Sequence, residues 1–369
     1  MEKPQKKLIL FMPSMDGGGV EKNLVLISNY LSKYIKNILL ITYGRKFNTK
    51  FNKNINIINA GKNYKKNANK YYKYYVCLKI LFQEALKKPR ISVFAFQANI
   101  YCIILSIILD FKLIVRSNSS PSGWSKSYIK NTIFKILLKY PKFIIVNSYH
   151  FKNELKKKFN ISSNVIYNPL NKKEILKKSN SKFKLDFFSS KNDLKIINIS
   201  RFTDQKDHLT LLKGFKIINT KINSKLLIIG YGPNKSLIKE YIRKNKLNKI
   251  VKIIKYQDNP YKFLKKADLF ILTSLYEGLP NVILEAMFLK KFVISSNCPT
   301  GPKEILNNEK YGFLFKMKNH EELAKKIYLY KKNRNIYKKK INLGFKSLYR
   351  FDFENNCKKY LLLVKKIIN

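Results

Sequence analysis

Two glutamates separated by seven residues stand in the segment 267–287, which reads ADLFILTSLYEGLPNVILEAM. The pattern predicts a buried strand, a tight Gly-Leu-Pro turn and a helix that begins near Asn281. Glu277 then lies at the turn and Glu285 about one turn into the helix. One carboxylate can accept hydrogen bonds from two neighbouring ribose hydroxyls, and the other can hold the hydroxyls of a hexose beside its anomeric carbon. The arrangement therefore suits a nucleotide sugar.

The position of this pair carries more information than its spacing. In an isolated helix, two glutamates would be interpreted as solvated charges. Here they follow the carboxyl end of a predicted strand, which is where open α/β sheets bind their ligands. The start of the next helix also offers backbone amides to an anion. Strand, turn and helix together favour a binding site.

A second group of charged residues lies in the segment 198–212, NISRFTDQKDHLTLL. A strand over 196–200 is expected to end at Arg201, and a helix is expected to start after Asp204. Arg201 and Lys206 are therefore candidates for a diphosphate clamp, which would neutralise the charge that builds on a leaving nucleotide diphosphate. Arginine offers phosphate a planar fork, whereas lysine acts as a point charge. Lys206 could instead be a surface lysine at a helix start.

Two glycine-containing turns also follow predicted strands. In the segment 226–234, LLIIGYGPN, Gly230 and Gly232 would let the backbone approach a nucleotide, although the fuller dinucleotide-binding pattern is absent. In the segment 16–22, DGGGVEK, three glycines precede a helix that opens at about Val20, which is where phosphate-cradling loops lie. Successive glycines favour close approach of the backbone to a ligand.

The elements that must position these residues alternate along the whole chain. Short apolar runs bounded by turn residues are separated by longer helical patterns, which is typical of parallel sheets with crossover helices, so the fold class is α/β. The strands are predicted at 8–12, 38–43, 55–59, 92–96, 112–115, 143–147, 165–167, 196–200, 226–229, 252–254, 269–273, 292–295 and 313–315.

With 369 residues, the chain is long enough for two domains of ordinary size. A lysine-rich, weakly patterned stretch after Pro169 interrupts the alternation, and strands start afresh at Lys195. We expect an acceptor-side Rossmann-like domain over 1–172 and a linker over 173–194. A nucleotide-sugar-binding Rossmann-like domain over 195–349 and a C-terminal helix over 350–369 that packs back on the first domain would follow.

The formal net charge is +53, and nearly all of the excess is lysine, since the chain contains seven arginines. The lysines are spread along the chain, which favours a solvated surface and a compositional bias. A functional alternative is attraction to an anionic membrane surface or an anionic lipid-linked substrate. Nucleic acid is a third class of partner that such charge would attract.

From cysteine usage and hydropathy we expect a cytoplasmic protein. The four cysteines have no paired or metal-type spacing, so free thiols in a reducing compartment are expected. They are Cys77, Cys102, Cys298 and Cys357. The apolar run 8–12 is too short for a signal-peptide core and suits a first strand. The run 100–109 is about half the length of a membrane span, so no transmembrane helix is predicted.

Taken together, these motifs resemble the retaining GT-B transferases of glycosyltransferase family 4, the group 1 glycosyl transferases, whose hallmark is Glu, seven residues, Glu. The resemblance is specific over about 195–306 and looser elsewhere. The segments that carry it are SRFTDQKDH (200–208), GYGP (230–233), YEGLPNVILEAM (276–287) and NCPTGPKEIL (297–306), with GGGVEK, VRSNSSP (115–121) and IYNPL (166–170) in the first half.

The resemblance implies two Rossmann-like domains that face each other across a cleft, with the donor held by the second domain. It implies that Arg201 and Lys206 bind the diphosphate, that Glu277 holds the donor sugar, and that Glu285 holds the ribose. The residues that would complete the donor site are Gly18, Gly19, Gly230, Gly232, Leu279, Pro280 and Asn281.

The family's mechanism agrees with what the sequence lacks. No Asp-any-Asp pair follows a strand, so we expect no metal and no cofactor beyond the donor, with Arg201 and Lys206 in the metal's place. No protein nucleophile stands out, which fits front-face displacement, in which the departing phosphate helps to deprotonate the acceptor hydroxyl.

The acceptor side departs from the family pattern. Many relatives carry a histidine in the first domain, but the comparable segment here, AFQANIY (95–101), has none, and Asn99 is the substitute we predict. Arg116 and Asn118 follow a strand and could line the acceptor side or have structural roles. Of the histidines, His150 and His320 are expected on solvated helices, and His208 is expected to be structural.

The sequence therefore predicts a metal-independent, retaining glycosyltransferase that moves a hexose or N-acetylhexosamine, with uridine diphosphate (UDP) as the expected carrier. The expected acceptor is a lipid-linked or polysaccharide glycan in the synthesis of capsule, O-antigen, lipopolysaccharide or a similar bacterial surface glycan. The expected location is the inner face of the cytoplasmic membrane, with peripheral association to anionic lipid.

Two alternatives from other classes remain open at this stage. Sugar-nucleotide epimerases share the scaffold and bind UDP-sugars, and an epimerase would convert the donor without an acceptor. The net charge also raises the possibility of a basic nucleic-acid-binding protein, although no recognised nucleic-acid module is present, so no specific nucleic acid is expected.

Overall fold

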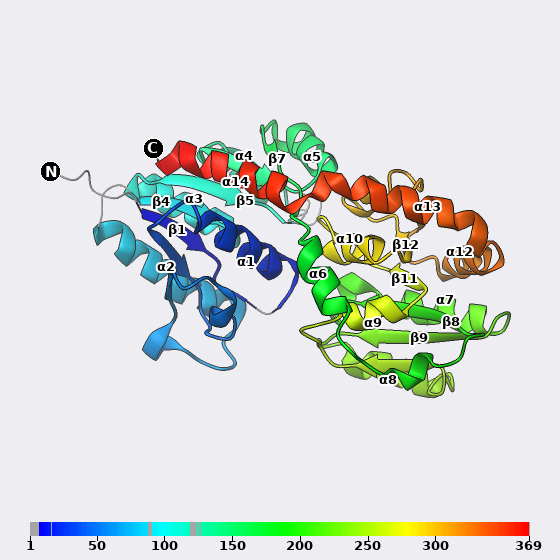
Figure 1. The fold of residues 1–369 in the computed structure, drawn as a ribbon. Helices are drawn as coiled ribbons and strands as arrows, with labels where there is room; N and C mark the ends of the chain where they lie inside the picture. The colour runs from blue at the N-terminus through cyan, green and yellow to red at the C-terminus, as the bar shows by residue number, and fades with distance from the viewer. Residues whose placement is uncertain (1–6, 16, 88–90, 119–123, 125–126, 369) are drawn as a thin grey trace. The chain divides into compact units, whose positions relative to one another are not determined.

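The computed structural model describes residues 7–15, 17–87, 91–118, 124 and 127–368. The chain divides into two compact units, of which Figure 1 shows the first in blue to green with the red C-terminal helix, and the second in green to orange. The first unit takes in Met1–Pro169 together with Phe353–Asn369, and the second takes in Leu170–Asp352. The stretch 173–194, which we expected to be a linker, lies within the second unit.

The first unit is built on a seven-stranded sheet in which every pairing is parallel. The strand order is β3-β2-β1-β4-β5-β6-β7, and the order reverses direction between β1 and β4. The strands are β1 (Lys7–Phe11), β2 (Ile38–Ile41), β3 (Ile55–Ile58), β4 (Ile91–Ala95), β5 (Lys112–Arg116), β6 (Phe143–Val146) and β7 (Asn164–Val165).

Two hydrophobic clusters lie on opposite faces of this sheet, because successive strand residues point to opposite sides. In β1, Ile9 belongs to one cluster and Leu10 to the other. Side chains from α2 (Lys70–Lys87), α3 (Asn99–Leu109), α4 (Tyr128–Leu137) and α5 (Tyr149–Phe159) pack in the cluster of Ile9. Those of α1 (Gly19–Leu31) and α14 (Phe353–Ile368) pack in the cluster of Leu10.

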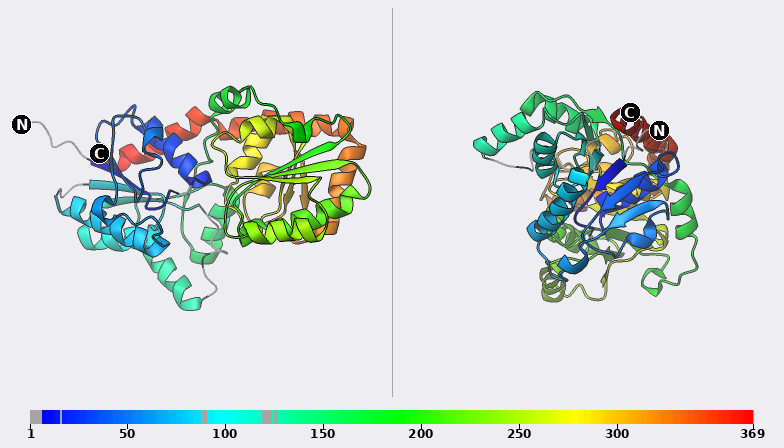
Figure 2. Two further views of the ribbon diagram at one scale, coloured as in Figure 1. Left: turned by 90° about the horizontal axis from the view of Figure 1, so that it is seen from below. Right: turned by 90° about the vertical axis from the view of Figure 1, so that its left-hand side faces the viewer.

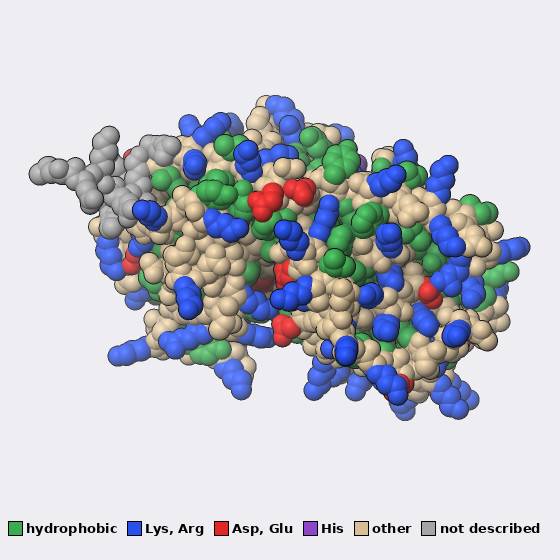
Figure 3. Space-filling view, viewed as in Figure 1, with side chains coloured by type: hydrophobic (Ala, Val, Ile, Leu, Met, Phe, Trp, Pro, Cys, Tyr) green, Lys and Arg blue, Asp and Glu red, His purple; other side chains and the backbone are tan. Residues whose placement is uncertain are grey.

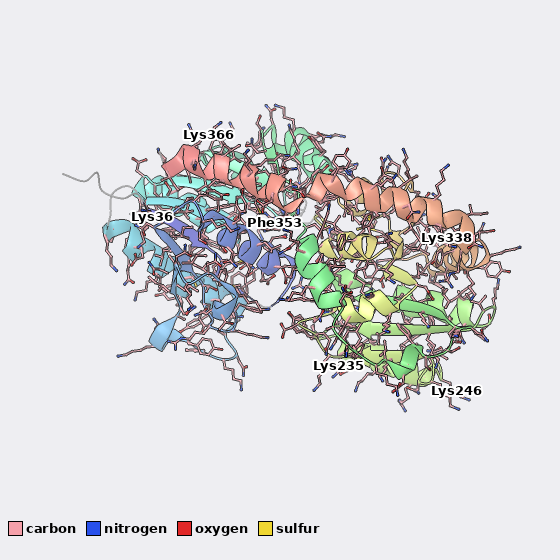
Figure 4. All side chains as sticks on the ribbon, in the orientation of Figure 1. Lys36, Lys235, Lys246, Lys338, Phe353 and Lys366 are labelled. Atoms are coloured by element: carbon pink, nitrogen blue, oxygen red, sulfur yellow. The ribbon has the colours of Figure 1, made fainter. Side chains whose placement is uncertain are left out.

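The C-terminal helix α14 thus completes the core of the first unit, as the fold class predicted. Phe353, labelled in Figure 4, begins this helix, and its ring meets that of Tyr30 on α1 edge-on with centroids 5.9 Å apart. Farther along, Ser92 of β4 donates a hydrogen bond to the carbonyl oxygen of Ile367 at 2.8 Å. Residues near both ends of the chain therefore share one core.

The second unit contains a six-stranded, wholly parallel sheet. Its order is β10-β9-β8-β11-β12-β13, with a reversal of direction between β8 and β11. The strands are β8 (Leu194–Ile199), β9 (Ser224–Ile229), β10 (Val251–Ile254), β11 (Leu269–Leu272), β12 (Phe292–Ser296) and β13 (Phe313–Phe315). Every strand that the sequence predicted in both halves is present, with small shifts at its ends.

Helices surround this second sheet. Side chains of α7 (His208–Asn219), α8 (Lys235–Lys244) and α12 (His320–Lys332) form a hydrophobic cluster with the strands. The remaining helices are α6 (Lys172–Ser179), α9 (Tyr261–Lys266), α10 (Asn281–Phe288), α11 (Pro302–Ile305) and α13 (Arg334–Ser347). The expected linker is tied to this unit because Phe183 packs edge-on against Phe263 of α9, with centroids 4.4 Å apart.

Two further observations concern hydropathy and thiols. Among the helices that the structure describes, none combines the length and the apolar character that a membrane crossing requires. The four cysteines are buried and unpaired, which confirms the prediction of free thiols. Burial raises the pKa of the Cys77 and Cys298 thiols to about 12, so neither offers a thiolate near neutral pH.

Candidate active site

The point at which the second sheet reverses its strand order lies between β8 and β11. In open α/β sheets, the loops after the two strands at such a point separate and leave room for a ligand at their carboxyl ends. Arg201 and Lys206 follow β8, whereas Glu277 follows β11. The topology therefore brings together two segments that are about 70 residues apart in the sequence.

Lys206 and Glu277 form an ion pair at this point. Lys206 Nζ lies 2.5 Å from Glu277 Oε1, and both side chains are largely shielded from solvent. The hydroxyl of Ser274 donates a second hydrogen bond, of 2.6 Å, to the same carboxylate oxygen. The predicted phosphate ligand and the predicted sugar ligand thus neutralise each other's charge.

Backbone contacts hold the two loops against each other. The amide of Leu275 donates to the carbonyl of Gln205 at 2.8 Å, and Gln205 Nε2 donates to the carbonyl of Tyr276 at 2.8 Å. Thr273 Oγ1 donates to the carbonyl of Lys206 at 2.8 Å. Lys206 lies in a short 3-10 turn, Asp204–Lys206, ahead of α7, where we had expected the helix itself to start.

A third loop, after β12, supports Glu277 from its backbone side. Thr300 Oγ1 donates to the carbonyl of Glu277 at 2.5 Å, and Ser296 Oγ donates to the carbonyl of Ser274 at 2.5 Å. Gly301 has a φ of 52°, and a Cβ atom there would lie 2.2 Å from the carbonyl oxygen of Gly278. Only glycine fits this close approach.

Arg201 differs from Lys206 because its side chain is exposed. No hydrogen bond or ion pair of its guanidinium group is found within the described part of the chain. The residue after it is fixed, since the amide of Phe202 donates to the carbonyl of Tyr231 at 2.7 Å. The structure therefore presents a free guanidinium on a firmly held loop, as an anion-binding role requires.

Gly230 and Gly232 have a packing role that the sequence did not reveal. A Cβ on Gly230 would lie 1.9 Å from the carbonyl oxygen of Ser200, and one on Gly232 would lie 2.4 Å from that of Phe202. Both glycines therefore let the loop after β9 pack directly on the loop that carries Arg201. This packing role does not depend on contact of the two glycines with a nucleotide.

Glu285 is buried on α10, where Tyr261 Oη donates to its Oε1 at 3.4 Å. Leu279 and Pro280 are also buried, and Asn281 is half-buried at the first turn of α10. The helix starts at the predicted residue. A carboxylate buried in so apolar a segment requires polar partners, and the Tyr261 hydroxyl is one of them.

His208 lies under the loop that carries Lys206. Its Nε2 lies 3.0 Å from Ser200 Oγ, and its ring meets that of Phe202 edge-on. Burial, with a smaller effect from the positive charge of Lys206, lowers the pKa of His208 to about 4. The imidazole is therefore neutral near pH 7, and its contacts are those of a structural residue.

In the first unit, the predicted phosphate loop precedes α1. The amide of Gly18 donates to Glu21 Oε2 at 2.9 Å, so the glutamate caps the start of the helix. Gly19 is exposed at the first position of α1. Asp16 and residues 119–121 of the predicted motifs lie outside the described residues. The capping carboxylate occupies one amide that we had assigned to phosphate.

Arg116, for which we expected either an acceptor-side or a structural role, is a core residue with 1% of its surface exposed. Its Nε donates to Tyr360 Oη on α14 at 2.9 Å, and one of its terminal nitrogens donates to Asn168 Oδ1 at 2.6 Å. Its other terminal nitrogen donates to Asn118 Oδ1. The guanidinium thus joins β5 to the C-terminal helix.

The two asparagines near Arg116 have different surroundings. Asn118 Nδ2 donates to the carbonyl of Phe96 at 2.9 Å, and this hydrogen bond fixes the Asn118 side chain against the segment that follows β4. Asn99 Nδ2 donates to the carbonyl of Arg116 at 3.1 Å. Its Oδ1 is buried without a hydrogen-bond partner among the described residues. Asn99 therefore retains an acceptor for a polar group.

Sequence reasoning missed the hydroxyl groups that position Glu277. Ser274 and Thr300 lie within segments that we had singled out, but neither received a role. Hydroxyl residues at the end of an apolar strand were the available signal, since such side chains bond to nearby backbone and carboxylate groups. Within the described residues, no group of three or more His, Cys, Asp or Glu side chains could hold a metal ion.

Lysine and arginine side chains are distributed over the surface that Figure 3 shows, and few acidic side chains lie among them. Of the lysines labelled in Figure 4, Lys338 and Lys366 are exposed on α13 and α14, and Lys36 and Lys246 are exposed in the connections that follow α1 and α8. The positive charge is therefore not confined to the candidate site.

Comparison with known proteins identifies a matching family model and several relatives. Residues 179–346 match the family model of glycosyl transferases group 1. The chain is 38% identical over 211 residues to an uncharacterized glycosyltransferase of Methanocaldococcus jannaschii, a match that covers 53% of this chain and 50% of that relative.

A second relative matches over almost its whole length. It is a Campylobacter jejuni α-1,4-N-acetyl-D-galactosaminyltransferase for GalNAc-α-(1→4)-GalNAc-α-(1→3)-diNAcBac-PP-undecaprenol, 26% identical over 377 residues, with 98% of this chain and 99% of the relative covered. The crystal structure of Anabaena HepE in complex with UDP-glucose superposes with a TM-score of 0.78 at 17% identity, covering 98% of this chain and 99% of HepE. This last likeness concerns the fold.

Proposed function

We propose that this chain, whose residues 179–346 match the glycosyl transferases group 1 model and whose fold is GT-B, is a glycosyltransferase that transfers a sugar from a nucleotide diphosphate sugar with retention of the anomeric configuration. The observation that carries the proposal is the Lys206–Glu277 pair at the strand-order reversal, beside the exposed Arg201. The pair contains one ligand for a diphosphate and one for sugar hydroxyls.

Donor binding would exchange one set of contacts for another. The Lys206 ammonium would move its charge onto the diphosphate, and Glu277 would accept hydrogen bonds from hydroxyls of the sugar. Ser274 and Thr300 would keep the Glu277 loop in place through this exchange, since their hydrogen bonds do not involve Lys206. Glu285 would hold the two ribose hydroxyls.

The transfer itself would be a front-face displacement. The bond between the anomeric carbon and the phosphate oxygen breaks, and the acceptor oxygen forms its bond to the same face of that carbon. The departing phosphate takes the acceptor's proton. Arg201 and Lys206 would stabilise the charge that develops on the leaving diphosphate, so that no metal ion is needed.

We further infer a UDP-sugar as donor, a hexose or N-acetylhexosamine as the transferred unit, and a lipid-linked glycan as acceptor. HepE binds UDP-glucose, and the Campylobacter relative acts on an undecaprenol-linked acceptor. Both facts concern those proteins and support the extension to this one. An enzyme with such an acceptor would work at the inner face of the cytoplasmic membrane, in the synthesis of a surface glycan such as capsule or O-antigen.

The test is a transfer assay with a panel of UDP- and GDP-sugars and a short polyprenyl-diphosphate glycan, in the presence of a chelator. We expect a product that is one sugar longer. Its new linkage, measured by NMR, should be α when the donor is an α-linked nucleotide sugar. Conversion of the donor to its epimer without acceptor would replace the proposal by the epimerase alternative. An inverted linkage would remove the retaining mechanism.

A further inference from the structure

Helix α4 of the first unit carries an apolar stripe on its solvent side. The stripe consists of Ile129, Ile133 and Ile136, which follow one another at i, i+4 and i+7 and therefore lie along one side of the helix, with Tyr140 in the turn just beyond its end. All four are exposed, Ile129 to 71%. No packing requirement within the described first unit explains these side chains.

The opposite side of α4 is the one that packs. Phe134 meets Trp124 edge-on with ring centroids 5.8 Å apart, and Leu138 is buried at the C-terminal end of the helix. Both belong to the hydrophobic cluster around Ile9. Helix α4 thus has one apolar side for its own core and a second that faces outward, and both views of Figure 2 show it projecting from the rest of the first unit.

The neighbouring helix α3 extends this surface. It contains no charged residue, and its outward side chains are apolar, namely Tyr101, Ile104, Ile107 and Ile108. Ile108 is 67% exposed. Exposed apolar side chains gathered on two helices that contact each other are a feature of interaction sites, because most soluble surfaces expose such residues singly.

The charges beside the stripe are all positive. Lys130 lies on one side of it, and Lys135 and Lys139 lie on the other, all three exposed. No Asp or Glu occurs in the sequence between Asp110 and Glu154. An apolar stripe flanked by lysines is the arrangement with which helices bind the interface of a bilayer that contains anionic lipid.

We propose that the outward face of α3 and α4, which we call the docking face, binds the surface of an anionic lipid bilayer. This inference rests on the proposed lipid-linked acceptor and names the part of the chain that meets the membrane carrying it. The isoleucine side chains would enter the boundary between headgroups and acyl chains, and the lysines would remain at the level of the anionic headgroups.

Charge complementarity distinguishes this occupant from a second copy of the chain. Two docking faces brought together would oppose their own lysines with no carboxylate on either helix to offset them. Lipid phosphates supply the missing negative charge. The bilayer also accepts the isoleucines, which nucleic acid would leave in contact with polar groups.

The test is flotation of the full chain with lipid vesicles. One set contains phosphatidylcholine alone, and the other also contains about 30 mol % of the anionic lipid phosphatidylglycerol. The test variant is Ile129→Gln with Ile133→Gln and Ile136→Gln. A matched control replaces three equally exposed aliphatic residues elsewhere, Leu237→Gln, Ile336→Gln and Leu362→Gln. Glutamine preserves helix propensity in both.

We expect the wild type and the control to float with the anionic vesicles only. The test variant should partition at least about 10-fold less, because three aliphatic side chains lose their burial. A second variant, Lys130→Gln with Lys135→Gln and Lys139→Gln, should weaken binding by roughly fivefold per lysine at low salt and should lose most of the salt dependence.

Flotation of both variants at the wild-type level would overturn the proposal, and so would a wild type that does not float. A change from dimer to monomer by light scattering in the isoleucine variant, with flotation unchanged, would assign this face to a second copy. UDP binding, measured on the same samples, separates the two proposals, since a variant that no longer floats should bind UDP as the wild type does.

Discussion

The loops at the carboxyl edges of the two sheets use arginine in opposite ways. In the second unit, Arg201 is exposed on a loop that neighbouring backbone holds in place. In the first unit, Arg116 is the last residue of β5, one strand beyond the reversal of strand order, and is buried against α14. A strand that ends in arginine therefore does not by itself identify a ligand site.

The surrounding groups account for this difference. The Arg116 guanidinium donates to Tyr360, Asn168 and Asn118, so its donors are used within the protein. On the loops that the structure describes around Arg201, polar side chains bind each other and not the guanidinium group, as in the Lys206–Glu277 ion pair. A buried charge whose donors are satisfied stabilises a fold, whereas an exposed one on a fixed loop remains available to an anion.

The largest expected effect concerns the second unit. Arg201→Ala and Lys206→Ala should each lower the transfer rate about 100 to 1000-fold at saturating donor, because each removes a positive charge from the leaving diphosphate. Initial rates measured with the donor and acceptor identified by the transfer assay provide the check. A loss of less than about threefold in both variants would remove the clamp from the mechanism.

His208 offers a way to sharpen the comparison through pH. Its pKa is about 4 in the folded chain and 6.5 when unfolded, so the unfolded state binds more protons between these values. Stability should fall by up to about 3 kcal/mol as the pH drops from about 6.5 to about 4. Denaturant titrations over this pH range should show a weaker dependence of stability on pH for His208→Gln than for the wild type. The exposed His150→Gln variant should keep the wild-type dependence.

Replacement of each arginine by methionine tests directly whether Arg116 and Arg201 contribute differently to stability. Arg116→Met should lower the free energy of unfolding by about 2 kcal/mol, because Tyr360 and two asparagines lose a buried donor. Arg201→Met should leave it within about 0.5 kcal/mol, as surface substitutions do. Urea titration measures both, and equal losses would contradict the assignment of separate roles.

A smaller effect is expected for the glycine that supports the Arg201 loop. Gly230→Ala places a Cβ 1.9 Å from the carbonyl oxygen of Ser200, so the loops must separate, at a cost of about 1 kcal/mol or more. The matched Gly44→Ala meets only one ring atom at 4.0 Å and should be tolerated. Equal thermal stability of the two variants would mean that the contact is readily relaxed.

The sequence predicted every strand because buried parallel strands read as short apolar runs, such as Leu8 to Met12, between helical patterns. It also predicted that Lys206 and Glu277 belong to one site, since both follow strands at an edge where ligands bind. The helix start near Asn281 was predicted by the change from an apolar run to a Gly-Leu-Pro turn.

The missing details depend on tertiary packing. Nothing local distinguishes Arg116 from Arg201, because the partner that buries Arg116 is Tyr360, more than two hundred residues away. The stretch 173–194 has a weak pattern, yet α6 and Phe183 pack on the second unit. The packing of Gly230 on Ser200 likewise connects neighbouring strands and leaves no trace in either segment alone.

The central claim is that the loops at the strand-order reversal of the second unit bind the nucleotide of the donor. Calorimetric titration with UDP, without added metal, should give binding by the wild type and by the control Glu240→Ala, whose side chain is exposed on α8. Glu285→Ala should bind at least about 10-fold more weakly, since it loses the carboxylate for the ribose hydroxyls. A folded wild type that binds neither UDP nor GDP, or a Glu285→Ala variant with unchanged affinity, would contradict the claim.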